Sequence, residues 1–184
     1  MEKERQLIKG CREGDNSARK ELYTTYSKQL LAICYRYTGD MEAAHDVLHD
    51  AFVKIFTRFT YRGESSLSTW LTKVVMAQAI DYLRKKQLKE RLFVPEEEIP
   101  DVPELVEAPA DETLSEQRLM KFIAELPEGC RTVFNLVVFE HKAHKEIAEL
   151  LGIKEHSSIS QLHYAKYLLA NRINEYRNDK ERKR

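Results

Sequence analysis

The chain has few of the residues that build turn-rich or cross-linked folds. Its 184 residues include only six glycines and five prolines, which favours long helices over a β fold with many tight turns. The three cysteines, Cys11, Cys34 and Cys130, are odd in number and far apart. This spacing excludes a disulfide framework and a CxxC metal knuckle. We therefore expect a protein of the reducing cytoplasm.

Long apolar runs are also lacking. No stretch approaches the ~20 apolar residues that a bilayer span needs, so we expect no membrane span. The charged segment 1–5 is not followed by an apolar core, which predicts that there is no secretory signal. Hydrophobic residues make up 42% of the chain and charged residues 33%, a composition that is typical of a soluble folded protein.

The chain also has no net charge, because its 30 basic and 30 acidic side chains cancel. The charges are nevertheless separated along the chain. Residues 94–117 hold nine acids and no Lys or Arg, whereas residues 1–93 have a net charge of +5 and residues 118–184 a net charge of +4. Each of the two basic parts can therefore face phosphates, although the whole chain is neutral.

The acidic segment predicts the domain organisation. It contains four prolines and no apolar periodicity, as expected of an extended, self-repelling linker. We predict an all-α fold of two small helical domains, 1–93 and 114–184, joined by a flexible acidic linker at 94–113.

Apolar residues recur every three or four positions in the first domain, which predicts helices over 18–37, 44–59 and 67–87. Asp15 and Asp40 stand where N-caps are expected, and Gly39 stands where a helix should end. In the second domain, helices are expected from residue 114, from Pro127 in a first turn, over 145–151 and over 157–176. Gly152 then occupies the turn of a helix-turn-helix, whose internal wedge we expect to consist of Ile147, Ala148, Leu151, Ile153, Ile159 and Leu162.

Four segments resemble a known family. Residues 46–52 (DVLHDAF) and 61–71 (YRGESSLSTWL), the latter followed by DYLRK at 81–85, are similar to the first conserved domain of the extracytoplasmic-function (group 4) sigma factors of RNA polymerase. Residues 126–134 (LPEGCRTVF) and 145–153 (KEIAELLGI) resemble the minus-thirty-five-binding domain of the same family. Both halves occur in the family's order around an acidic linker.

The resemblance implies an alternative sigma factor, which recruits core RNA polymerase to promoter DNA and is not an enzyme. It assigns binding of the polymerase clamp helices to Asp46, His49, Asp50 and Phe52. Minus-ten contacts are implied for a loop that captures a flipped base and for the helix after it: Tyr61, Arg62, Gly63, Glu64, Ser65, Ser66, Trp70, Arg84, Lys85 and Lys86. For Tyr61 and Trp70, packing in the core is the open alternative.

Minus-thirty-five contacts are implied for the second domain, with the helix from Ser157 in the major groove: Arg131, Lys145, Ser157, Ser158, Gln161, Tyr164 and Lys166. The same domain is expected to bind the polymerase flap, and an anti-sigma factor is expected to hold the protein inactive. The chain departs from the family pattern at Ala77, His156, Ile159 and Tyr164, where members often carry other residues. These changes predict a weak or unusual minus-thirty-five contact.

Two alternatives stay open at this stage. In the first, the chain is a DNA-binding regulator that uses the helix-turn-helix alone. In the second, it is a sigma mimic that sequesters an anti-sigma factor. No Gly-rich phosphate loop, HExxH or nucleophile-elbow motif is present, so we predict no catalytic residue, no metal and no cofactor.

Overall fold

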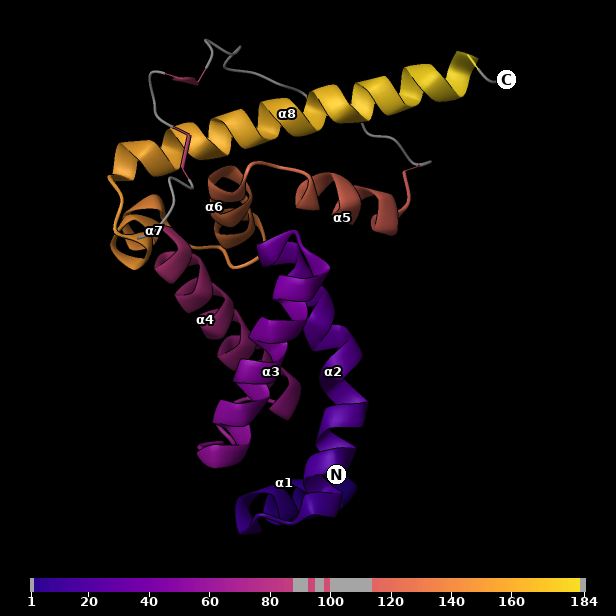
Figure 1. Ribbon diagram of the computed structural model, residues 1–184, viewed down its shortest axis with the longest axis vertical. Helices are drawn as coiled ribbons and strands as arrows, with labels where there is room; N and C mark the ends of the chain where they lie inside the picture. The colour runs from indigo at the N-terminus through magenta and orange to yellow at the C-terminus, as the bar shows by residue number, and fades with distance from the viewer. Residues whose placement is uncertain (1, 88–92, 95–97, 100–113, 183–184) are drawn as a thin grey trace. The chain divides into compact units, whose positions relative to one another are not determined.

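The computed structural model describes residues 2–87, 93–94, 98–99 and 114–182. These residues form α-helices with short connections and no strand, as the all-α prediction requires (Figure 1). By its contacts the chain forms two compact units, 1–83 and 84–184, and the boundary between them lies near the end of α4 (Leu67–Gln87). Most of the predicted linker 94–113 lies outside the described residues.

The first unit is built from α1 (Glu2–Glu13), α2 (Asn16–Thr38), α3 (Met41–Thr57) and most of α4 (Leu67–Gln87). The predicted caps are confirmed. Asp15 accepts hydrogen bonds from the backbone N–H of Ser17 and Ala18 at the start of α2, which satisfies two donors that lack helical partners. Gly39 ends α2 with φ 69°, and Asp40 caps α3.

Close packing of α1 on α2 depends on a glycine. A Cβ at Gly10 would lie 2.6 Å from the Cβ of Ala18, so only glycine lets the two backbones approach this far. The core of the unit contains apolar side chains from all four helices. Its largest fully buried members are Leu22, Leu30, Tyr37, Val47, Ile55, Leu67, Leu71 and Val75.

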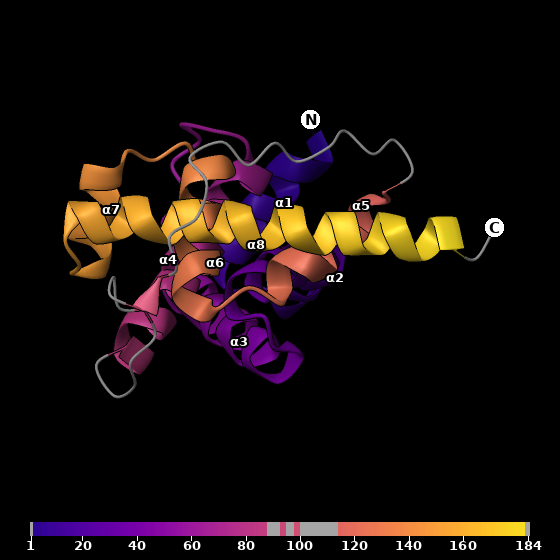
Figure 2. The ribbon, with the colours of Figure 1, turned by 90° about the horizontal axis from the view of Figure 1, so that it is seen from above.

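The second unit contains α5 (Glu116–Ala124), α6 (Glu128–Val138), α7 (His144–Leu151) and α8 (Glu155–Arg182). Helix α8 runs along the other three (Figures 1 and 2). Buried side chains of α5, α6 and α8 form its main apolar cluster: Phe122, Ile123, Leu126, Cys130, Ala165, Leu169 and Ile173.

Helices α7 and α8 form the predicted helix-turn-helix. Gly152 ends α7 in the left-handed conformation with φ 68°, and the N–H of Ile153 donates to the carbonyl of Ala148 at 3.1 Å. One member of the expected wedge is wrong. Ile159 is 48% exposed, because α8 turns the neighbouring Ser158 toward the core instead, beside the expected Leu162.

None of the helices in the described ranges has the length and apolar character that crossing a membrane requires. The thiols of Cys11, Cys34 and Cys130 are all buried and free.

Candidate functional site

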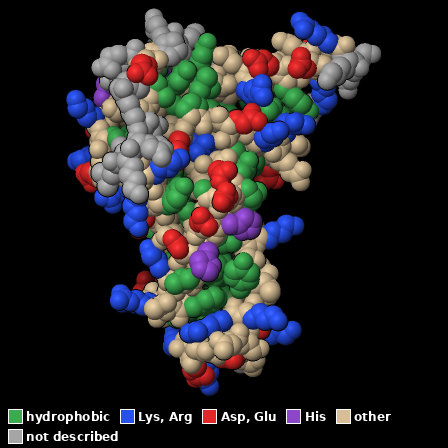
Figure 3. All heavy atoms as spheres, in the orientation of Figure 1, with side chains coloured by type: hydrophobic (Ala, Val, Ile, Leu, Met, Phe, Trp, Pro, Cys, Tyr) green, Lys and Arg blue, Asp and Glu red, His purple; other side chains and the backbone are tan. Residues whose placement is uncertain are grey.

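The exposed side of α3 carries most of the residues predicted to bind polymerase. Asp46, His49 and Asp50 are exposed on it, together with Glu42, at spacings of three and four residues that place them on neighbouring turns. Figure 3 shows acidic and histidine side chains gathered on the face where α2 and α3 lie. We call this set the α3 acidic face.

Phe52, the fourth predicted polymerase contact, lies on the buried side of α3 and not on that face. Its side chain is 4% exposed, and its ring lies 4.8 Å from the ring of Tyr23 and 5.5 Å from that of Phe56. An aromatic ring of this size contributes more by filling the core than by standing in water, and its spacing from Leu48 and Ile55 puts it on the buried stripe of α3.

Asp50 also forms a contact inside the first unit. Its Oδ2 accepts a hydrogen bond of 3.3 Å from Nε2 of Gln78 on α4, whose side chain is buried. Lys54 and Asp81 also connect α3 with α4, at 3.8 Å. Asp46 is therefore the cleaner probe of a contact outside the unit.

The connection between α3 and α4 is a closed loop, residues 58–66. The hydroxyl of Tyr61 donates to the carbonyl of Ser65 at 2.6 Å, and Gly63 turns the chain with φ 82°. From α1, Nη2 of Arg12 donates to the carbonyl of Tyr61 at 3.0 Å. The loop is thus held at both ends, while the tip carries exposed Arg62 and Glu64.

Helix α4 begins directly after this loop. The Oγ of Ser66 accepts from the backbone N–H of Thr69 at 3.1 Å, so the exposed Ser66 caps the helix. One turn later, the ring of Trp70 lies 5.3 Å from Phe59 and 5.5 Å from Tyr61. Trp70 is partly buried, so it both packs and stays accessible.

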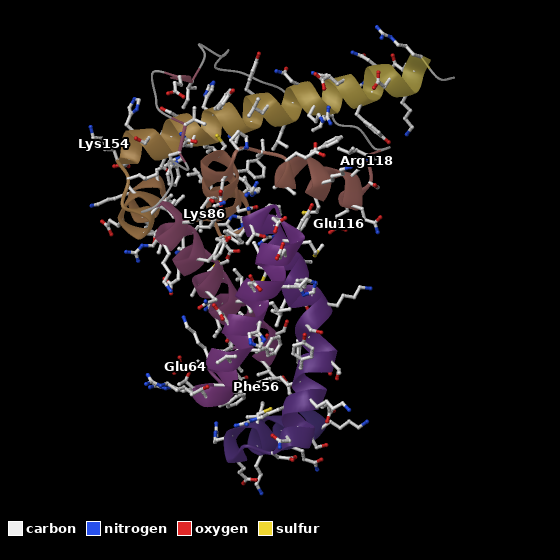
Figure 4. The ribbon with its side chains drawn as sticks, viewed as in Figure 1. Phe56, Glu64, Lys86, Glu116, Arg118 and Lys154 are labelled. Atoms are coloured by element: carbon white, nitrogen blue, oxygen red, sulfur yellow. The ribbon has the colours of Figure 1, made fainter. Side chains whose placement is uncertain are left out.

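A pocket of about 470 Å³ opens at this loop, within the ~300–1,000 Å³ usual for small-ligand sites. Figure 4 shows Glu64 at this end of the first unit. Five of the residues that line the pocket were predicted as minus-ten contacts, and the other two, Thr60 and Lys73, were not. The lining comprises Thr60, Tyr61, Arg62, Glu64, Ser65, Trp70 and Lys73.

The structure adds residues that the resemblance did not supply. Lys73 lies one turn after Trp70, so helical spacing alone places both on one side of α4. Arg12 is 49 residues from the loop carbonyl that it binds, and no local pattern signals such a contact. A second pocket, of about 530 Å³, shares Thr60 and Trp70 with the first and is lined further by Val53, Lys54, Ile55, Thr57, Arg58 and Val74.

The predicted basic run lies in the last turn of α4. Arg84 and Lys85 are exposed and Lys86 is partly buried. Cations at a helix C-terminus are favourable for the helix dipole, and the exposed pair is available for phosphates as well.

Three of the predicted minus-thirty-five contacts have side chains that are buried in the second unit. Arg131 is 5% exposed, and its Nη1 donates to the carbonyls of Ala124 and Leu126 at 2.8 Å each. Ser158 is fully buried with its hydroxyl 2.9 Å from Nδ1 of His144. Gln161 is 1% exposed. Buried polar groups need such partners, and these side chains are engaged inside the unit.

The remaining predicted contacts differ in exposure. Lys145 and Lys166 are exposed, and Ser157 is partly buried. Tyr164 packs against the apolar cluster and stacks on Tyr167, with ring centroids 6.4 Å apart.

Four exposed residues at the start of α8 were not predicted as contacts: Glu155, His156, Ile159 and Lys154, the last just before the helix. Figure 4 shows Lys154 at the end of α8 that lies beside α7. Together with Lys145 and Lys166 they form the outward side of the helix-turn-helix, which we call the α8 outer face.

Comparisons with known proteins match both units. The model of Sigma-70 region 2 matches residues 22–89, and that of Sigma-70, region 4 matches residues 116–169. Over 177 residues, the chain is 26% identical to the ECF RNA polymerase sigma-E factor of Haemophilus influenzae, covering 91% of this chain and 93% of that protein.

The chain is also 24% identical over 176 residues to the ECF RNA polymerase sigma factor SigW of Bacillus subtilis, covering 90% and 94% of the two proteins. A solved structure, the sigma factor RpoE in complex with the anti-sigma factor NepR from Bartonella quintana, covers 82% of this chain and 92% of that one. Its identity is 18% and its TM-score 0.43.

Proposed function

Since this chain belongs to the extracytoplasmic-function family of alternative sigma factors, we propose that three surfaces carry its contacts in transcription initiation. They are the α3 acidic face, the pocket at the α3–α4 loop and the α8 outer face. The chain acts in the cytoplasm as a specificity subunit and has no catalytic role of its own. The family resemblance also makes an anti-sigma factor its regulating partner.

The observation that carries this proposal is the loop pocket. It offers an aromatic wall in Trp70, cations in Arg62 and Lys73, and short polar groups in Ser65 and Thr60. An unstacked base needs this combination, because rings accept its face, hydroxyls bond its edge and cations hold the displaced strand. Capture of such a base opens the duplex without nucleotide hydrolysis.

The α3 acidic face is the proposed contact with core polymerase. Exposed carboxylates one turn apart, such as Asp46 and Asp50, suit a basic, Arg-bearing helical surface, because carboxylate and guanidinium form charge-assisted hydrogen bonds. The helix-turn-helix supplies the third contact, with the outer face of α8 in the major groove of upstream DNA. Lys145 and Lys166 bind phosphates and set its position.

The test is run-off transcription with sigma-free core polymerase and a pool of genomic fragments. Wild-type protein should yield discrete start sites. Asp46→Lys should weaken core binding at least ~tenfold, because coupling across close charge pairs is worth ~1.5–7 kcal/mol. Glu21→Lys, an exposed change of equal charge on α2, is the matched control and should bind core as the wild type does.

The pocket is tested separately by Arg62→Ala. This variant should bind core normally and should bind double-stranded upstream DNA normally as holoenzyme, yet give fewer open complexes by permanganate footprinting. Transcription by the wild type without any specific start site would refute the sigma function, and normal opening by Arg62→Ala would refute the role of the pocket.

A further inference from the structure

Among the described residues of α8, Ile159 is the only large apolar side chain that is exposed. It is 48% exposed, while Ser158 before it is fully buried and Leu162 after it is 9% exposed. The helix therefore places a polar side chain inside and an isoleucine outside, which gains no burial in the free protein. Single exposed apolar side chains are common on protein surfaces, and Met41 and Val53 of the first unit are exposed to the same degree, so it is the position of Ile159 that decides.

The surroundings of Ile159 identify the kind of partner. It lies in the second turn of α8, and the early residues of a recognition helix are the ones that reach base edges. Lys154 precedes the helix, Lys166 follows two turns later, and Lys145 lies at the start of α7; all three are exposed. Exposed Glu146, Glu149 and Glu155 lie among them, so the charge of this surface is mixed. The three lysines are the groups that can hold phosphates on either side of an apolar centre, with bases in the middle.

We propose that Ile159 reads the methyl group of a thymine in the major groove of the upstream promoter element. This inference rests on the proposed function and adds the base that the helix prefers. Thymine is the base whose major-groove edge carries an apolar group, the C5 methyl, and apolar side chains recognise it by contact. An isoleucine offers no hydrogen bond, so its selectivity comes from that methyl alone.

The side chains of His156 and Ser160, near Ile159 on α8, interact with each other. His156, three residues before Ile159, and Ser160, the residue after it, face each other through Nδ1 and Oγ at 3.4 Å. Ser160 also donates to the carbonyl of His156 at 3.2 Å. These two side chains are oriented along the helix. The isoleucine between them is the one that projects apolar surface from this turn.

The experiment uses holoenzyme, the full chain with core polymerase. Upstream elements are first selected from random DNA, and each thymine of the selected element, on either strand, is then replaced by deoxyuridine. This exchange removes one methyl group and leaves base pairing intact. We expect one position at which uracil weakens holoenzyme binding about fourfold, the ratio that corresponds to ~0.8 kcal/mol for one buried methyl-sized group.

Variants assign the effect to the side chain. Ile159→Ala should bind the thymine promoter about as weakly as the wild type binds the uracil promoter, and it should no longer distinguish the two. Val138→Ala is the matched control, because Val138 is 38% exposed at the end of α6; it should keep the full thymine preference. Both exchanges affect exposed side chains, and thermal unfolding should confirm that each variant remains folded.

Two results would overturn the inference. Either uracil is tolerated at every position, or Ile159→Ala keeps the thymine preference. A loss of holoenzyme assembly by Ile159→Ala, with uracil tolerated, would show that a protein surface covers the residue instead. The proposed function survives each of these results as long as discrete start sites are made, so the two failures are distinguishable.

Discussion

Arg131 provides the sharpest test of the difference between a DNA contact and a structural role. It is 5% exposed, and its Nη1 donates to the carbonyls of Ala124 and Leu126 at 2.8 Å each. Ala124 is the last residue of α5, and the carbonyls at a helix end lack partners within the helix. Arg131 thus binds the end of α5 to α6 from inside the unit.

The magnitude follows from those two contacts. A hydrogen bond to a charged group contributes ~1.5–3 kcal/mol, and a buried carbonyl that loses its partner costs ~1–3 kcal/mol. Arg131→Met keeps most of the aliphatic volume of the side chain, so packing recovers part of the stability lost with the two hydrogen bonds. We therefore expect Arg131→Met to lower the free energy of unfolding of the second unit by about 3–5 kcal/mol, as is usual when one partner of a buried charged contact is removed.

The assay is hydrogen exchange of amides in α5–α8, with urea unfolding of the same protein. Lys145→Met is the reciprocal control, because Lys145 is exposed: it should change stability by less than ~0.5 kcal/mol and weaken DNA binding. If Arg131→Met were as stable as the wild type and bound DNA more weakly, the structural assignment would be wrong and the sequence-based one right.

Further predictions concern caps and thiols. Asp15→Ala should destabilise the first unit by about 1 kcal/mol in urea, because two backbone donors of α2 lose their acceptor, whereas Asn16→Ala should have little effect. Gly152→Ala should cost about 1–2 kcal/mol, because its φ of 68° disfavours a Cβ although no atom lies within 4 Å; unchanged thermal stability would contradict this. Burial raises the pKa of Cys34 to about 12, so the folded protein holds this proton where the unfolded chain releases it. The corresponding stability is complete well below pH 9 and is lost as pH rises from about 9 toward 12, by about 1.4 kcal/mol at pH 10. Cys34→Ala should show a smaller loss between pH 8 and pH 10, and an equal loss would argue against the buried thiol.

The elements that the sequence predicted well are those with a local cause. Asp15, Gly39, Asp40 and Gly152 act through the backbone of their own few residues, so position in the chain is enough to assign them. The same holds for α4, whose predicted bounds at 67 and 87 are those observed. Loop residues 61–66 also follow from chain order, because they close on themselves through Tyr61 and Ser65.

The buried residues among the predicted contacts have partners that the sequence pattern does not show. A family pattern gives which residue recurs at a position but not whether its side chain points outward, and Phe52 and Arg131 both point inward. Arg131 is charged, and charged residues are almost never fully buried unless paired; its partners are backbone carbonyls, which no pattern of side chains reveals. Arg12 was missed for the same reason, since its acceptor is the carbonyl of Tyr61.

In the first turns of α8, polar side chains are buried and an apolar one is exposed, the reverse of what hydrophobic periodicity predicts. Hydrophobic periodicity put Ile159 inside, whereas the structure puts Ser158 and Gln161 there. The exchange is possible because both polar side chains find partners: Ser158 pairs with His144, and Gln161 accepts from the Cys130 thiol at 3.0 Å. A satisfied polar group costs little in a core, and an exposed isoleucine gains nothing there. Local rules are broken most often at functional sites, and the pattern in α8 failed at Ile159, the residue for which we propose a contact with DNA.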